Sequence, residues 1–265
     1  MKKKVKRTVP KKKKKAASKK KKRKIHHRRK FKKIERVPTG IKNFDRLIEG
    51  GFEKNSTNLL VGSSGSGKTV FSVQFLIEGI KRGEKCLLVS FEEQKEALYE
   101  NMAELGFDLE KYEKEGKFFF IEHTPEKVKR MLEEGGGEIE TIVLSKNISR
   151  IVIDSATSFI LLFDKELEKK EAALSLFNLL KGWNCTSLLI SEENPLEERH
   201  SSRVLDLEAD SIILMYFIKG KKERERYIEI LKMRGTNHSL KAHRYVIRKG
   251  GIVVSKSPSK MPIKK

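Results

Sequence analysis

The sequence has little cysteine and no long apolar run. Its two cysteines, Cys86 and Cys185, each lie in a strand-like apolar segment and show no CxxC spacing. A disulfide framework and a cysteine-based zinc site therefore have little support. The longest apolar runs, 159–163 and 212–218, are far below the roughly 20 residues that a membrane-spanning helix needs. The amino terminus is basic but lacks the apolar segment of a secretory signal, so we expect a cytoplasmic protein.

Histidine is scarce and scattered, which argues against a histidine-based metal centre. No pair shows the HxxxH or HxxE spacing that would place two ligands on one face. We therefore interpret five histidines as solvated or structural: His26, His27, His123, His200 and His243. We expect no metal other than Mg²⁺ bound together with a nucleotide.

Acidic residues are absent from the first 33 positions. This segment holds 21 of the 59 lysines and arginines, so almost all of the net charge of +23 lies in it. Its only larger apolar residues are Val5, Val9, Ile25 and Phe31. They are too few to offset the entropy lost on ordering the segment. We therefore expect a disordered tail, 1–33, and one folded domain, 34–265, with about ten flexible residues at its end.

A tail of this charge is suited to binding polyanions such as DNA or RNA without reading their sequence, by releasing condensed counterions. Only Phe31 could stack on a base, so base-specific recognition of a single strand is not expected. A tail that only solvates the protein, or one that follows anionic lipid surfaces, is the alternative.

The rest of the chain first alternates between strand-like and helix-like segments. The expected strands are 58–61, 85–91, 118–122, 150–154 and 187–191, and the expected helices are 68–81, 94–105, 126–134 and 166–181. This alternation predicts an α/β fold with a mainly parallel sheet flanked by helices. Ahead of it, Thr39 is expected to cap a short helix that runs through Leu47.

The pattern changes after the polar stretch 192–210, which reads as a loop. Four short strands are expected there, at 211–217, 227–233, 243–248 and 252–254. Turns such as Lys249-Gly250-Gly251 separate them, so they are expected to extend the sheet with antiparallel members.

A phosphate-binding motif, GxxxxGK[ST], lies between the first expected strand and helix. It consists of Gly62, Ser63, Ser64, Gly65, Ser66, Gly67, Lys68 and Thr69, with Val70 next to it. A glycine-rich turn lets successive backbone N–H groups converge on phosphate oxygens at a helix N-terminus. Lys68 would reach the β- and γ-phosphates, and Thr69 would bind Mg²⁺. The motif predicts binding of Mg-ATP, although the loop itself does not distinguish ATP from GTP.

Carboxylates follow two further strands. Asp154 ends the strand 150–154, where a second acidic group of such a site would hold a magnesium-bound water. Glu92 and Glu93 follow the strand 85–91 directly, and at the carboxyl edge of a parallel sheet one of them could polarise the attacking water. Adjacent acids are also ordinary at a helix N-terminus, so the residues alone leave both readings open.

Five motifs, in this order, resemble the KaiC-type ATPases of the RecA superfamily over about residues 34–255. They are Pro38-Thr39-Gly40, the loop 62–69, Ser90-Phe91-Glu92-Glu93, Ile153-Asp154-Ser155 and Lys232-Met233-Arg234-Gly235-Thr236-Asn237-His238. The resemblance implies a RecA-like core and ATP hydrolysis. It also implies that the Glu92–Glu93 pair supplies the catalytic base, with Glu93 slightly favoured and no physical reason to exclude Glu92.

The resemblance further implies assembly into a ring, by analogy a hexamer, or into a filament. Lys232 and Arg234 would then act on the γ-phosphate held by a neighbouring subunit, and Thr236 and His238 would line the same pocket. A cation placed against the charge that develops in phosphoryl transfer contributes on the order of 10³-fold or more in rate. Ser191-Glu192 resembles the position where related ATPases sense the nucleotide, although a simple turn is the alternative.

The resemblance is incomplete, because KaiC proper has two such domains and this chain has one. It therefore implies no role in a circadian clock. The function expected first is a regulatory ATPase in which the nucleotide switches the polar stretch 192–210. A nucleotide-regulated binding module with little turnover, anchored on nucleic acid by its tail, is the rival. A recombinase-like protein is the third hypothesis, weakened because the chain has no room for a separate folded DNA-binding domain.

Overall fold

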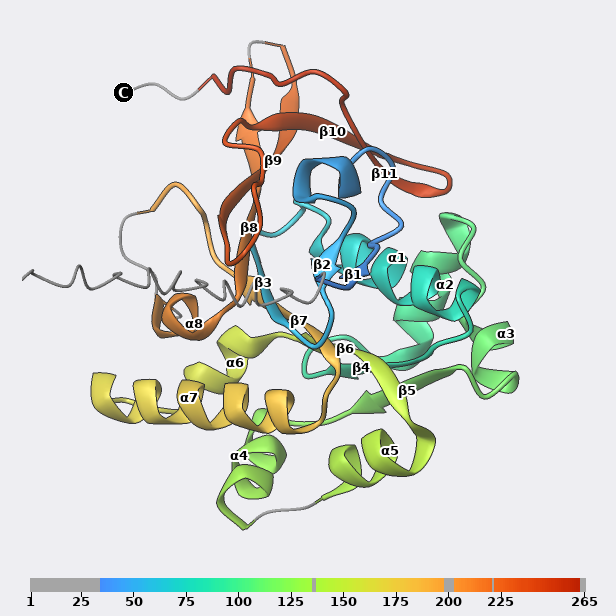
Figure 1. The fold of residues 1–265 in the computed structure, drawn as a ribbon, viewed down its shortest axis with the longest axis vertical. Coiled ribbons are helices and arrows are strands. Elements are labelled where there is room, and N and C mark those ends of the chain that lie inside the picture. The colour runs from blue at the N-terminus through green and yellow to red at the C-terminus, as the bar shows by residue number, and fades with distance from the viewer. Residues whose placement is uncertain (1–33, 135–136, 198–202, 221, 263–265) are drawn as a thin grey trace, which may run out of the picture. The chain divides into compact units, whose positions relative to one another are not determined.

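Strands and helices alternate as the sequence predicts (Figure 1). The computed structural model describes residues 34–134, 137–197, 203–220 and 222–262, so the expected disorder of 1–33 lies outside it. The strands are β1 (Arg36–Val37), β2 (Phe52–Glu53), β3 (Thr57–Gly62), β4 (Lys85–Ser90), β5 (Phe118–Glu122), β6 (Ile148–Asp154), β7 (Thr186–Glu192), β8 (Ser211–Lys219), β9 (Arg224–Met233), β10 (His243–Arg248) and β11 (Gly251–Val254). The helices are the 3₁₀ helix η1 (Asp45–Ile48), α1 (Lys68–Lys81), α2 (Lys95–Glu104), α3 (Leu109–Lys114), α4 (Pro125–Glu134), α5 (Glu138–Lys146), α6 (Ala156–Ile160), α7 (Glu166–Gly182) and α8 (Arg203–Glu208).

Nine of the described strands form one sheet in the order β11-β10-β9-β8-β3-β7-β6-β4-β5. From β8 to β5 all neighbours are parallel, and β9, β10 and β11 continue the sheet as antiparallel strands. The predicted fold class is therefore confirmed. One detail of the prediction is wrong: the first of the four late strands, β8, pairs parallel with β3. It can do so because a helix-containing segment separates β7 from β8, long enough for a crossover.

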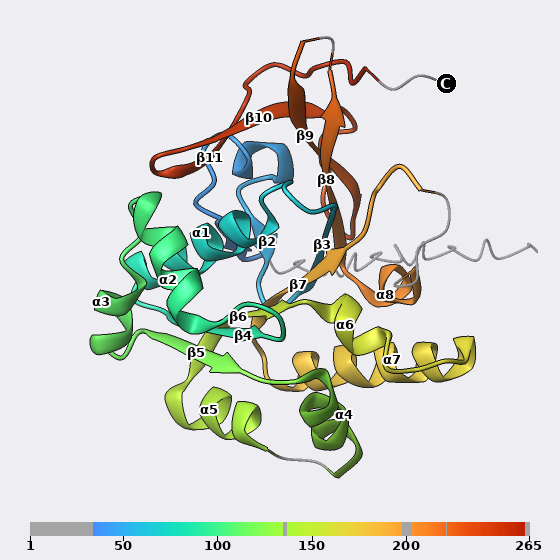
Figure 2. The same ribbon diagram turned by 180° about the vertical axis from the view of Figure 1, so that it is seen from behind.

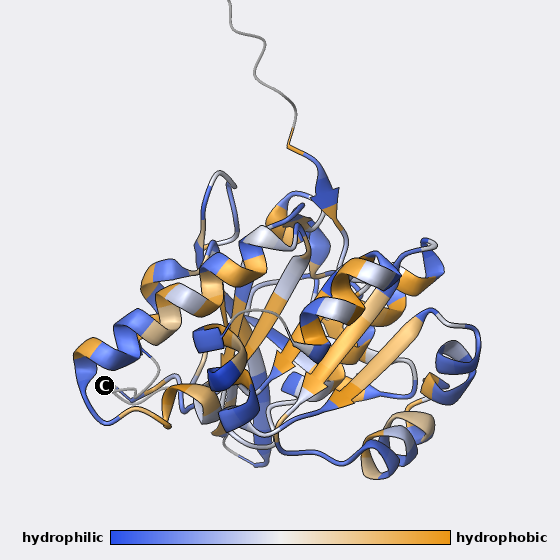
Figure 3. Cartoon of the chain, turned by 90° about the horizontal axis from the view of Figure 1, so that it is seen from below, coloured by the Kyte–Doolittle hydropathy of each residue, from blue (hydrophilic) through white to orange (hydrophobic). Residues whose placement is uncertain are grey.

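The sheet separates two hydrophobic clusters. Neighbouring residues of a central strand alternate between them: Leu60 packs with α1 on one face, and Leu59 packs with α7 on the other. Strands buried on both faces read as continuous apolar runs, which is why the predicted strands were visible in the sequence. Figure 3 shows this layering, with mostly hydrophobic strands flanked by helices that mix hydrophobic and hydrophilic residues.

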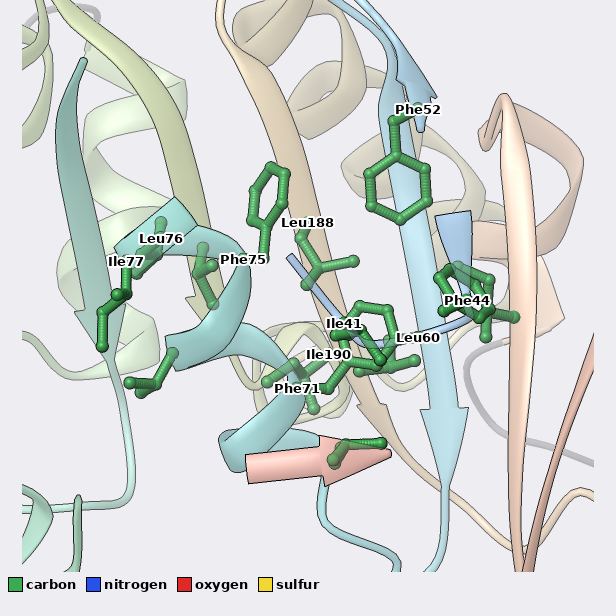
Figure 4. Close-up of a cluster of buried hydrophobic side chains, with 14 of the residues drawn as sticks. Ile41, Phe44, Phe52, Leu60, Phe71, Phe75, Leu76, Ile77, Leu188 and Ile190 are labelled. Carbon is green, nitrogen blue, oxygen red and sulfur yellow. The ribbon is translucent and has the colours of Figure 1, made fainter. Parts of the chain in front are cut away.

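In the first cluster, aromatic side chains of the segment that precedes β3 pack against aromatic side chains of α1 (Figure 4). Phe44 meets Phe71 edge to face at 5.4 Å between ring centres, and Phe52 meets Phe75 at 5.7 Å. Such pairs add about 0.5–1.5 kcal/mol beyond the burial of their area. The segment 37–52, called the entry segment below, is thereby bound to α1, which begins at the glycine-rich loop.

The expected helix from Thr39 to Leu47 is wrong in extent, because only η1, Asp45–Ile48, is helical. The Thr39 hydroxyl and backbone N–H both donate to the carboxylate of Asp45, at 2.6 and 2.9 Å. Thr39 therefore caps no helix; it closes a tight turn in which Gly40 takes a φ of +74°.

The polar stretch 192–210 is not wholly a loop, since its described part contains α8. Val204 and Leu205 of α8 are buried in the second cluster, which explains a helix that the surrounding polar residues concealed. Among the described residues, no helix is both long enough and apolar enough to cross a membrane.

Candidate functional site

Four strand ends meet at one edge of the sheet, because β3, β7, β6 and β4 are neighbours in this order and run in the same direction (Figures 1 and 2). The glycine-rich loop 62–69 follows β3, Glu192 ends β7, Asp154 ends β6, and Glu92-Glu93 follows β4. Most of these residues, together with residues of α2, line a pocket of about 540 Å³. The carboxyl edge of a parallel sheet is where α/β proteins bind ligands.

The loop takes a conformation that depends on its glycines. Gly65 and Gly67 have φ angles of +79° and +93°, which residues with a side chain rarely adopt. A Cβ atom on Gly67 would also lie 2.5 Å from Cδ1 of Ile247. Among the described residues, Ser66 carries the one buried side-chain oxygen without a hydrogen-bond partner, an orphaned polar atom inside the loop. The sequence prediction of a strand, a phosphate loop and a helix in succession agrees with this geometry.

Side chains from the late strands hold the loop from outside, and sequence reasoning did not identify them. Arg226 of β9 donates from Nε to the Gly65 carbonyl at 3.0 Å. Tyr245 of β10 donates its hydroxyl to the Ser66 carbonyl. These contacts join residues about 160 and 180 positions apart, so no local pattern indicates them. They hold the carbonyls of Gly65 and Ser66. A glycine-rich loop of this kind binds an anion through its backbone N–H groups.

Lys68 is almost fully buried at the start of α1, with an exposed fraction of 8%. Its Nζ donates to the Ser63 carbonyl at 3.2 Å and lies 3.6 Å from Oε1 of Glu192. The proposed phosphate-binding cation and the proposed nucleotide sensor are thus in direct contact. A γ-phosphate would compete with Glu192 for the same ammonium group.

Asp154 lies at the centre of the edge, and its pKa is raised to about 7. Burial is the main cause, the nearby Glu92 carboxylate adds to it, and the Lys68 ammonium opposes it. A carboxylate that is costly to ionise is well placed to be neutralised by a cation.

The donor set fits Mg²⁺. The Thr69 hydroxyl and the Asp154 carboxylate line the same pocket and supply the oxygen ligands that Mg²⁺ prefers. Within the described ranges, no cluster of three His, Cys, Asp or Glu forms an all-protein metal cage. Mg²⁺ usually takes its other ligands from water and phosphate, so a site of this kind suits an ion that arrives with a nucleotide.

Glu92 and Glu93 both line the pocket but are held differently. The Glu92 carboxylate accepts hydrogen bonds from the hydroxyls of Ser155 and Ser158. Glu93 receives one contact on its carboxylate, from Asn101 of α2 at 3.3 Å. The sequence slightly favoured Glu93, whereas in the structure it is the Glu92 carboxylate that two hydroxyl groups hold.

Lys232, Arg234, Thr236 and His238 do not line the pocket of their own chain. Lys232 donates from Nζ to the Asp206 carbonyl at 2.9 Å, and Arg234 donates to the Leu207 carbonyl at 3.2 Å. These two cations therefore bind the carboxyl end of α8.

The other two residues of this segment are also occupied elsewhere. The Thr236 hydroxyl accepts from Arg36 at 2.7 Å, and His238 contacts the Ser239 carbonyl. Within one chain, the structure does not bring this segment to the glycine-rich loop.

Comparison with known proteins gives consistent matches. The family model described as "ATPase: KaiC" matches residues 37–259. The circadian clock protein KaiC3 of Synechocystis is 33% identical over 83% of this chain and 46% of its own length. A UPF0273 protein of Pyrococcus furiosus is 32% identical over 83% of this chain and 94% of its own length. The chain thus spans about half of KaiC3 and nearly all of the UPF0273 protein.

A solved structure supports the same relationship. The crystal structure of a KaiC-like protein from Pyrococcus horikoshii superposes with a TM-score of 0.74 at 36% identity. The match covers 84% of this chain and 99% of that protein.

Proposed function

Because this chain belongs to the KaiC family of ATPases, we propose that it binds Mg-ATP at the loop 62–69 and hydrolyses it to ADP and phosphate in a site shared between subunits. The observation that carries the proposal is the meeting of Lys68, Asp154, Glu92 and Glu192 at one pocket beside that loop. Strand ends that are far apart in sequence supply a phosphate-binding cation and three carboxylates there.

Each of these groups has a task in phosphoryl transfer. The loop N–H groups and Lys68 hold the phosphates, and Thr69 and Asp154 would hold Mg²⁺, which would neutralise charge on the phosphate oxygens. Glu92, with Glu93 as the alternative, accepts a hydrogen bond from the attacking water and orients it. Glu192 gives up its contact with Lys68 when a phosphate takes its place, so it is suited to reporting the nucleotide state to α8 and the residues before it.

Completion by a second subunit is supported by the cations of the pocket, since among the described residues Lys68 is the one lysine or arginine that lines it. Charge that develops on the transferred phosphoryl group calls for a further cation, and neither Lys232 nor Arg234 lines the pocket of its own chain. We propose that they reach the nucleotide of a neighbour in a ring, a hexamer by analogy with the family, or in a filament. Thr236 and His238, on the same segment, would line that shared site.

The test compares steady-state ATP turnover of Lys68→Ala, Arg234→Ala and their equimolar mixture. Each variant alone is expected to lose at least about 100-fold in turnover, because one lacks the phosphate cation and the other the transition-state cation. In the mixture, roughly one quarter of the sites pair an intact loop with an intact Arg234 by random assembly, so part of the activity should return. Lys81→Ala, at the other end of α1, is the matched control.

Three results would contradict the proposal at different points. Turnover of Lys68→Ala equal to that of the wild type would exclude the loop as the site of hydrolysis. Loss of activity in both variants without recovery in the mixture, or turnover strictly proportional to protein concentration, would leave a site completed within one chain.

A second function, polyanion binding by residues 1–33, is favoured by their composition. The segment combines 21 basic residues with no acidic one, whereas the remaining residues are nearly neutral overall. We propose that it holds the assembly on DNA or RNA through phosphate contacts that do not depend on base sequence. A nucleotide-regulated binding module with low turnover would use the same tail.

A further inference from the structure

A short turn rich in hydroxyl groups follows Asp154 and touches two of the other strand ends. Ser155 is the N-cap of α6, and Thr157 and Ser158 lie in its first turn. Because α6 follows β6 directly, this turn lies next to Asp154, which lines the pocket. None of these three side chains binds phosphate in the proposed mechanism, yet together they contact Glu92 and the backbone of Glu192.

The Glu92 carboxylate is held at a single oxygen. Oε1 accepts from Ser155 Oγ at 2.9 Å and from Ser158 Oγ at 2.5 Å. Each hydroxyl has one proton, so when both donate to Glu92 neither is left to donate to the other. Ser155 Oγ instead accepts from the Ser158 backbone N–H, at 3.4 Å. Two donors on Oε1 leave Oε2 as the acceptor available to a water in the pocket.

Thr157 ties the same turn to the end of β7. Its hydroxyl accepts from the Glu192 backbone N–H at 2.9 Å and donates to Ser191 Oγ at 3.3 Å. Thr157 and Ser191 are both buried, so this arrangement has little room to move. The turn is therefore anchored on β7 while it presents the two serine hydroxyls to Glu92.

Without these hydrogen bonds, the Glu92 side chain would not be held in one orientation. Glu92 is exposed, and two other carboxylates, Asp154 and Glu192, line the same pocket. Repulsion among like charges and side-chain entropy would both turn Glu92 towards solvent. Hydrogen bonds from neutral donors to an ionised carboxylate are stronger than those between neutral groups, and they act against both effects.

We propose that Ser158, on a turn anchored by Thr157, is a positioning residue that aims Oε2 of Glu92 at the attacking water. The inference rests on the proposed function, and it assigns the water-orienting role to Glu92 rather than Glu93. Ser158 does not touch the nucleotide; it acts through Glu92 alone.

The experiment measures single-turnover hydrolysis of radiolabelled ATP by the full chain, together with the Kd of ATP by calorimetry. Ser158→Ala is expected to lower the hydrolysis rate by about 10- to 100-fold, the effect of misplacing a catalytic group, with Kd changed less than about twofold. Ser158→Thr, which keeps the hydroxyl, is expected to restore the rate. Ser175→Ala, at an exposed position of α7, controls for the loss of a helical hydroxyl, and thermal unfolding confirms that each variant is folded.

A double-mutant cycle tests whether Ser158 acts through Glu92. Adding Ser158→Ala to Glu92→Gln should not lower the hydrolysis rate further. Adding it to Glu93→Gln should lower the rate by the same factor as in the wild type. A Ser158→Ala enzyme that hydrolyses ATP like the wild type, a loss that Thr does not restore, or an undiminished loss in the Glu92→Gln background would each overturn the inference. The proposed function would survive those results as long as Lys68→Ala abolishes turnover, whereas a wild type without turnover would remove both.

Discussion

At the scale of single residues, Asp154 shows how the pocket is prepared for a cation. Burial and the neighbouring Glu92 raise its pKa from 3.8 to about 7, so ionising this carboxylate in the folded protein costs free energy when no cation is bound. The unfolded chain imposes no such cost. The residue is therefore expected to reduce the stability of the nucleotide-free protein at neutral and higher pH.

The sign of this effect gives a prediction for Asp154→Asn. Between about pH 4 and pH 7, the folded protein retains a proton that the unfolded chain has released, so the free energy of unfolding falls as the pH rises through this window. The variant lacks the titrating group. It should match the wild type near the acidic end and unfold a few degrees higher at about pH 8, in thermal unfolding with chelator present.

An exposed aspartate supplies the control for that measurement. Asp164→Asn lies on a loop at the surface and should follow the wild-type profile. If Asp154→Asn follows it too, the carboxylate ionises freely in the folded protein and the pocket does not raise its pKa.

At the scale of elements, one buried side chain joins β6 to α1 and to two connecting segments. Arg150 of β6 is fully buried, and its guanidinium binds Glu84, which precedes β4, at 2.5 and 3.1 Å. It also donates to the carbonyls of Pro38 in the entry segment and Phe75 of α1. The helix that begins at the glycine-rich loop is thereby fixed to the strand that ends at Asp154.

Arg150→Met is therefore expected to lower the free energy of unfolding by about 3–5 kcal/mol, because it leaves the Glu84 carboxylate and the carbonyls of Pro38 and Phe75 without the guanidinium. Urea unfolding measures this free energy, and Arg130→Met, at an exposed position of α4, is the control. Since the pair acts as a unit, Arg150→Met combined with Glu84→Gln should cost less than the sum of the two changes. An effect of Arg150→Met as small as that of the control would show that the guanidinium contributes no net stability.

At the scale of the whole molecule, charge is divided between a basic segment and a nearly neutral remainder. If residues 1–33 neutralise about 10 phosphates, the slope of log affinity against log salt concentration is expected to be near −9 for double-stranded DNA. A chain starting at Ile34 should bind far more weakly and with a shallow slope. Fluorescence anisotropy with duplexes of different sequence measures both quantities.

The comparison of duplexes separates charge from sequence recognition. Equal affinity for unrelated sequences is expected, since phosphates are the same in all of them. Salt-insensitive binding, or equal binding by the full and shortened chains, would assign any nucleic-acid contact to residues 34–265.

Local sequence determined much of the fold because its signals lie within one element. The helix 68–81 and the strand 118–122 were predicted at their observed bounds, since each shows its periodicity or apolar run between clear stop signals. The glycine-rich loop carries its own conformation in its glycines. Asp154, Glu92 and Glu93 were identifiable because each follows an apolar strand, and parallel strands end at a common edge.

Short helices escaped prediction where tertiary contacts stabilise them. The helices α6 and α8 have five and six residues, too few to show a period or to form alone, and both bury side chains under the sheet. The apolar reading of the strand 150–154 likewise overlooked Arg150, whose partners lie far away in sequence.

The order of the strands was decided by tertiary structure alone, and the working details of the site follow from it. The order β3-β7-β6-β4 brings Glu192 to Lys68 and the hydroxyls after Asp154 to Glu92, while β9 and β10 fold back to hold the loop through Arg226 and Tyr245. The sequence alone determined which chemical groups the protein has and on which strand ends they lie. Which of these groups touch depends on packing between segments up to about 180 residues apart, and short-range patterns of residues do not record such contacts.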